Sequence, residues 1–74
     1  MEFNYAKLRG RIKEYGLTHE DLANKINIAQ STFSAKLNNK YDFTITEIKA
    51  ISNVLEISRD EIGLYFFYPN SSEN

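Results

Sequence analysis

The sequence predicts one compact, all-α domain of five helices. Three short segments each place a hydroxyl residue three positions before an acid, with an apolar residue just before the hydroxyl and another just after the acid, which is a pattern typical of helix N-termini. Between these segments apolar residues recur every three or four positions, and the alternation typical of strands is nearly absent. The chain of 74 residues has room for one domain around one core.

The first helix is expected to start after Asn4, whose side chain can cap it, and to close at Gly16 in a left-handed conformation. Four residues share its inward face at helical spacing: Tyr5, Leu8, Ile12 and Tyr15.

The three capping segments predict helices that start near residues 19, 45 and 59. In each, the hydroxyl accepts from the third helical N–H while the acid reaches back to the cap. The pairs are Thr18 with Asp21, Thr44 with Glu47, and Ser58 with Glu61. The inward stripe after Thr44 is Ile45, Ile48, Ile51, Val54 and Leu55. In the last helix Gly63 costs about 1 kcal/mol relative to alanine, and the tail at 70–74 is expected to be disordered.

The remaining helix is expected at about 29–38, within the stretch NIAQSTFSAKLNNK, which is rich in amides and hydroxyls. Its only large inward residues are Phe33 and Leu37, so most of its surface is polar. Because only Asn27 and Ile28 separate it from the preceding helix, the two helices are expected to cross steeply, with the small Ala23 at their approach. The arrangement over about 18–38 is a helix-turn-helix.

The segment THEDLANKINIAQSTFSAKLNNK resembles the helix-turn-helix of the lambda-repressor and Cro family of regulators. The similarity covers about residues 4–58 with the five-helix order of that family, and the whole chain looks like small phage-encoded Cro-like proteins of Gram-positive hosts. Asn27 stands where the family often has glycine, and asparagine tolerates the left-handed conformation well. The resemblance implies one lambda-repressor-like DNA-binding domain over 1–69.

The resemblance also implies a transcriptional repressor that reads the major groove of a double-stranded DNA operator with the helix at 29–38. The implied base-reading residues are Gln30, Ser31, Ser34 and Ala35. The implied contacts to the DNA backbone are Thr18, His19, Lys36, Asn38, Asn39 and Lys40. Glutamine can bond N6 and N7 of adenine together, and serine suits several bases. No cofactor and no small-molecule ligand is indicated.

Other readings of the same residues stay open. The polar helix can be a merely solvated face, and His19 can be a partly exposed residue at a helix start. The sequence pI is near 5.7, although nucleic-acid-binding domains often lie above about 9. Residues 1–41 hold seven basic and four acidic residues, a charge of +3, and residues 42–74 carry −4. The alternative is therefore a protein-binding module of the same fold, such as an antirepressor-like or antitoxin-like partner.

The sequence argues against an enzyme and against membrane association. With one histidine, no cysteine, no glycine-rich phosphate loop and no metal-ligand spacing, the chain offers little from which to assemble a catalytic or metal site. No apolar run approaches 18 residues and the N-terminus lacks a hydrophobic signal core, so a cytoplasmic protein is expected.

The stretch LYFFY at 64–68 is the most apolar run of the chain, and a core of this size cannot readily bury all four of its aromatic rings. Exposed aromatic patches generally mark partners. We expect Leu64, Phe67 and Tyr68 to form a symmetric homodimer contact, by helix packing or by pairing of short strands. The alternative is that this segment folds back over the helices at 5–15 and 45–55.

Overall fold

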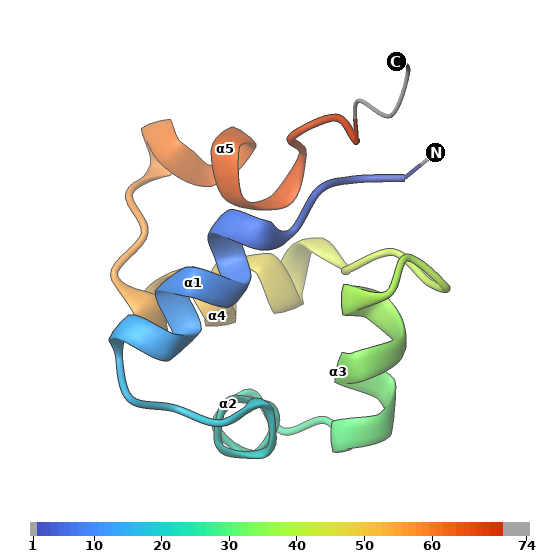
Figure 1. The fold of residues 1–74 in the computed structure, drawn as a ribbon. Helices are drawn as coiled ribbons and strands as arrows, with labels where there is room; N and C mark the ends of the chain where they lie inside the picture. Colours follow the sequence, from blue (N-terminus) through green and yellow to red (C-terminus); the bar gives the residue numbers. More distant parts are fainter. Residues whose placement is uncertain (1, 71–74) are drawn as a thin grey trace.

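The computed structural model describes residues 2–70, which form five α-helices (Figure 1). The helices are α1 (Ala6–Glu14), α2 (His19–Lys25), α3 (Gln30–Leu37), α4 (Ile45–Leu55) and α5 (Ile62–Phe66), with a 3₁₀ turn at Arg59–Glu61 before α5. These residues contain no β-strand, which confirms the all-α class, and none of their helices is long and apolar enough to cross a membrane. From residue 71 onward, the expected tail lies outside the described part of the chain.

One apolar core lies between all five helices. Its fully buried large side chains are Leu8, Ile12, Leu22, Phe33, Ile51, Leu55 and Phe66. Two expected core residues lie outside it: Tyr15 follows the last turn of α1 and is 37% exposed, and Ile45, the first residue of α4, is 69% exposed. Periodicity misplaced both because they lie at the ends of their helices, where a side chain on the inward face reaches the edge of the core.

Two of the three expected capping boxes are confirmed. The Thr18 hydroxyl accepts from the Asp21 N–H at 3.0 Å and the Asp21 carboxylate accepts from the Thr18 N–H at 2.9 Å. Thr44 and Glu47 repeat this pair at 3.1 and 2.9 Å.

The third expected capping box, at Ser58, is wrong. Its hydroxyl lies 3.3 Å from a carboxylate oxygen of Glu61 and caps no backbone group. The Glu61 N–H bonds the Ser58 carbonyl at 2.9 Å, so the backbone forms a 3₁₀ turn and α5 begins only at Ile62. At the first helix Tyr5, not the expected Asn4, occupies the N-cap position and no side chain caps the helix; Asn4 lies one residue earlier and accepts from the Ala6 N–H at 2.9 Å.

The first four helices end in the same way. A residue with positive φ follows each of them: Gly16, Asn27, Asn39 and Glu56. The next N–H then bonds a carbonyl inside the helix, as Ile28 does to Ala23 at 3.0 Å and Lys40 does to Ala35 at 2.9 Å. This termination satisfies helix carbonyls and turns the chain sharply. The left-handed conformations expected at Gly16 and Asn27 are therefore confirmed.

The sharp end of α2 sets the direction of α3. In Figure 1, α2 is seen along its axis while α3 runs across the view, so the two helices cross steeply, as expected. Ala23 lies fully buried in α2, and Phe33 of α3 is also fully buried. The short turn between Lys25 and Gln30 therefore presents α3 with one face against the core and the other toward solvent.

The two ends of the described chain lie side by side (Figure 1). Phe3 and Pro69 form an isolated antiparallel bridge, and the Asn4 N–H bonds the Tyr68 carbonyl at 2.8 Å. The C-terminal segment thus folds back on the chain, with α5 against α1. Tyr65 and Phe66 are buried there, whereas Phe67 and Tyr68 are about half exposed, so the aromatic run divides between core and surface.

Candidate nucleic-acid interface

The outer face of α3 carries the four residues expected to read bases. Gln30 and Ser31 are exposed in the first turn, and Ser34 and Ala35 are partly buried one turn later. Phe33 and Leu37 anchor the opposite face, at 0% and 3% exposure. One helix therefore brings these candidates together on a face whose orientation is fixed by the core.

The N-terminus of α3 has no side-chain cap, because Ala29 stands at the capping position in an extended conformation. The first-turn N–H groups lie at the positive end of the helix dipole, which favours anions such as phosphate. This end of α3 is therefore open to an anionic partner, which α2 and α4, with their capping boxes, are not.

His19 starts α2 and packs against the anchored ring of Phe33, with the two ring centroids 5.7 Å apart and an edge-on geometry. Desolvation by this packing, and secondarily the charge of Arg9, lowers the pKa of His19 below its ordinary value of about 6.5. The ring is therefore neutral near pH 7. It can offer a hydrogen bond to a phosphate but brings no charge.

The structure corrects the expectation for Lys36. The resemblance implies a contact to the DNA backbone, but its ammonium lies 2.6 and 2.7 Å from the two carboxylate oxygens of Glu47. The residue is only 8% exposed, and its charge joins α3 to the start of α4. Because the charge is neutralised inside the domain, Lys36 is no longer a candidate for a phosphate contact.

The segment after α3 holds three more candidates with different surroundings. Asn39 makes two side-chain hydrogen bonds with Phe3: its amide oxygen accepts from the Phe3 N–H and its amide nitrogen donates to the Phe3 carbonyl, both at 2.9 Å. Asn38 is exposed and keeps its amide N–H groups free to donate, and Lys40 is exposed with no ion pair among the described residues. Thr18, at the start of α2, keeps its hydroxyl hydrogen as a donor.

Arg9 adds a cation that the sequence did not single out. Its guanidinium Nη2 donates to the Leu37 carbonyl at 3.3 Å and to the Asn38 side-chain oxygen at 3.2 Å. Arg9 is an exposed residue of α1, and its guanidinium lies beside the C-terminal end of α3. Arg9 is 28 positions before Leu37, and no local pattern links them, so only the packing of α1 against this end of α3 reveals the contact.

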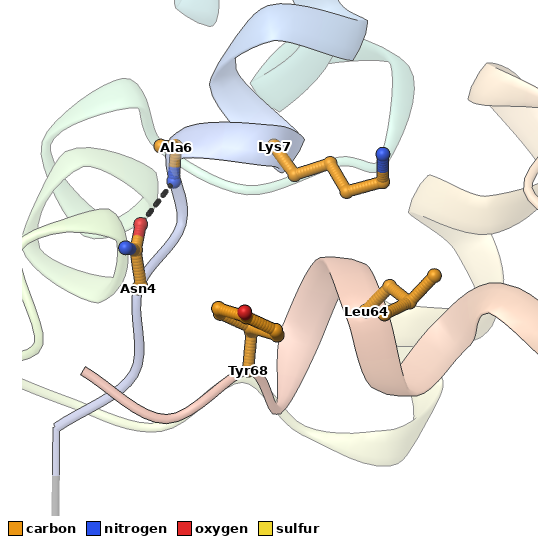
Figure 2. Close-up of a pocket in the computed structure, with 5 residues that line it drawn as sticks. All are labelled: Asn4, Ala6, Lys7, Leu64 and Tyr68. Atoms are coloured by element: carbon orange, nitrogen blue, oxygen red, sulfur yellow. Dashed lines mark hydrogen bonds between the residues drawn. The ribbon is translucent and has the colours of Figure 1, made fainter. Parts of the chain in front are cut away.

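The residues expected at a dimer contact divide between two surface depressions. Leu64 and Tyr68 line a groove of about 340 Å³ together with Asn4, Ala6 and Lys7 of the opposite wall (Figure 2). Phe67 lies in a second depression of about 270 Å³, where its ring meets that of Phe3 edge-on at 5.5 Å between centroids.

Fold and surface together define a small all-helical domain that presents one exposed polar helix on a pair of crossed helices. The chain belongs to the family of proteins of unknown function DUF739, whose model matches residues 1–69. No curated protein matches the chain.

Proposed function

We propose that this protein is a sequence-specific, DNA-binding transcriptional regulator, a repressor of the Cro type that binds an operator as a dimer. The observation that carries the proposal is the placement of α3: Phe33 and Leu37 fix it in the core, and its opposite face exposes Gln30 and Ser31. A helix presented in this way can enter the major groove, where base edges carry a distinct pattern of donors and acceptors.

In this proposal each residue has a stated chemical role. Gln30 bonds an adenine, Ser31 and Ser34 meet further base edges, and the Ala35 methyl contacts a thymine methyl. Lys40 and Arg9 supply positive charge to phosphates near the C-terminal end of α3. Two copies would occupy half-sites about 34 Å apart, one helical turn of DNA.

The proposal is tested by selecting binding sites from random double-stranded DNA and then comparing two variants on the selected site and on random DNA. Gln30→Ala removes a base contact, so we expect a loss of about 1–3 kcal/mol on the selected site only. Lys40→Ala removes a phosphate contact and should weaken both DNAs about equally. Both side chains are exposed, so the fold should be retained.

No enrichment of any site in the selection would contradict DNA reading altogether. Unchanged discrimination between the two DNAs in Gln30→Ala would contradict the assignment of α3 as the reading helix.

A protein-binding module is the second candidate, and a specific observation favours it. The chain has a pI near 5.7, and Leu64, Phe67 and Tyr68 are each about half exposed. Salt separates the two candidates, because binding to DNA releases counterions and weakens with added salt, whereas an interface formed by apolar residues responds little.

A further inference from the structure

We propose that Lys36 and Glu47 are positioning residues for DNA reading: their ion pair fixes the rotation of α3 about its own axis and so determines which side chains face the major groove. This inference rests on the proposed function and deepens it. It gives a role in sequence specificity to a buried pair of charges that makes no contact with DNA itself.

The ion pair joins the last turn of α3 to the first turn of α4. The Lys36 ammonium lies 2.6 and 2.7 Å from the two carboxylate oxygens of Glu47, and the two side chains are only 11% and 14% exposed. In Figure 1 the C-terminal end of α3 is the end that faces α4. Because one ammonium bonds both oxygens, the pair opposes a sideways movement of α3 against α4.

The Glu47 carboxylate is a fixed point of attachment. One of its oxygens also accepts from the Thr44 N–H at 2.9 Å, and the Glu47 N–H donates to the Thr44 hydroxyl at 3.1 Å. This capping box holds the carboxylate against the start of α4, and the next residue, Ile48, is buried in the core. The ammonium that binds this carboxylate is therefore held in one place as well.

The apolar contacts of α3 define its rotation less well. Phe33 and Leu37 are four positions apart and so differ by only about 40° around the helix, which means that they anchor α3 along one line. Lys36 lies about 60° from Phe33, on the side away from Leu37. A helix held along one line can rock about that line, and an attachment to one side of the line opposes the rocking.

The chemistry of the pair favours a role in orientation over a role in stability. Buried charges lose solvation that largely offsets their attraction, so a buried ion pair adds little net stability, and its best-attested use is to fix one arrangement among several. Rocking of α3 would displace Gln30, whose paired bonds to an adenine need two atoms placed together. The contact of Lys40 with a phosphate is less affected, because an ammonium acts as a point charge.

The experiment removes the pair without a change of net charge, in the double variant Lys36→Met with Glu47→Gln. Glutamine keeps a side-chain oxygen for the Thr44 N–H. Affinities for the selected site and for random DNA are measured at a temperature at which circular dichroism shows each protein to be folded. We expect about tenfold weaker binding to the selected site, as for the loss of one base contact, and unchanged binding to random DNA.

The ratio of the two affinities separates positioning from stability, because a loss of folded protein lowers both by the same factor. Thr44→Ala is the matched control: it removes the cap at the same end of α4 but leaves the ion pair in place, so the ratio should stay that of the wild-type protein. Lys36→Met alone should lose as much of the ratio as the double variant, since either change breaks the same pair.

Three results would overturn the inference: a wild-type ratio in the double variant, an equal loss in Thr44→Ala, or a loss in the double variant clearly greater than in Lys36→Met. A wild-type protein that does not distinguish the selected site from random DNA would instead overturn the proposed function.

Discussion

At the scale of single residues, the carboxylate of Glu47 accepts hydrogen bonds from two different elements of the fold. It accepts from the Lys36 ammonium at 2.6 and 2.7 Å and from the Thr44 N–H at 2.9 Å. Desolvation by burial alone would raise the pKa of Glu47, but the hydrogen bonds from Lys36 and Thr44 outweigh it and hold the pKa below its ordinary value.

This lowered pKa predicts how stability depends on pH. Because the folded state favours the ionised Glu47, its contribution is fully present above the unfolded pKa of about 4.3 and is lost as pH falls through the folded pKa. Lys36→Met leaves that carboxylate poorly paired, so we expect a loss of about 2 kcal/mol at pH 7 and a shallower decline in acid. Urea unfolding at several pH values measures both effects, and an unchanged acid profile in Lys36→Met would contradict this account.

Glu56 is strained, because it adopts a left-handed conformation with φ of 54° and carries a long side chain. Such a conformation costs a residue other than glycine about 1–2 kcal/mol. Glu56→Gly relieves that strain but loses a hydrogen bond from the Tyr15 hydroxyl at 3.2 Å. We expect a net gain of about 0.5 kcal/mol in the free energy of unfolding. Lys49→Gly is the control within α4, where the same residue should destabilise by about 0.7 kcal/mol.

At the scale of helices, the contribution of a capping box to stability can be compared directly, because the boxes at Thr18 and Thr44 form and the one at Ser58 does not. Thr44→Ala removes the hydroxyl that accepts from the Glu47 N–H, so we expect a loss of about 1 kcal/mol. Ser58→Ala should change stability by less than about 0.5 kcal/mol, because the Ser58 hydroxyl caps no backbone N–H. Thermal unfolding of the two variants measures the difference, and equal losses would contradict the 3₁₀ start of α5.

The helices could be predicted from the sequence because their signals are local. The caps at Thr18 and Thr44, and the left-handed positions at Gly16 and Asn27, depend on residues within five positions of each other. The four candidates on the outer face of α3 came from the resemblance to the helix-turn-helix of the lambda-repressor and Cro family, and the helix that carries them was expected from the local pattern.

Contacts between distant residues could not be predicted in the same way. Arg9 reaches Leu37 and Asn38, and Asn39 reaches Phe3 across 36 positions. Lys36 appears in the sequence as one more exposed cation. Only the packing of α3 against the start of α4 gives it a buried partner.

At the scale of the whole molecule, the small number of cations available for phosphate contacts limits how strongly the DNA affinity of this domain can depend on salt concentration. With Lys36 paired and His19 neutral, Arg9 and Lys40 remain as the charged residues at the C-terminal end of α3. Two neutralised phosphates per half-site predict a slope of about −2 in a plot of log K against log salt.

Two substitutions test this slope. Lys40→Ala should reduce it by about one, and His19→Gln should leave it unchanged at pH 7.5. Binding titrations over a range of salt concentrations on a one-site duplex measure the slope. A reduced slope in His19→Gln would show that His19 is charged when bound.

The pairing of residues 2–4 with 68–70 makes the backbone of this domain an almost closed ring. Closing the ring needs only a short linker, because the Asn4 N–H and the Tyr68 carbonyl are already 2.8 Å apart. A short closed loop costs little entropy. A circular permutant joined there and opened at the exposed Tyr41 would keep every helix and place its new ends directly after the segment that follows α3. The order in which the helices are connected is thus separable from the packing that holds α3 in place.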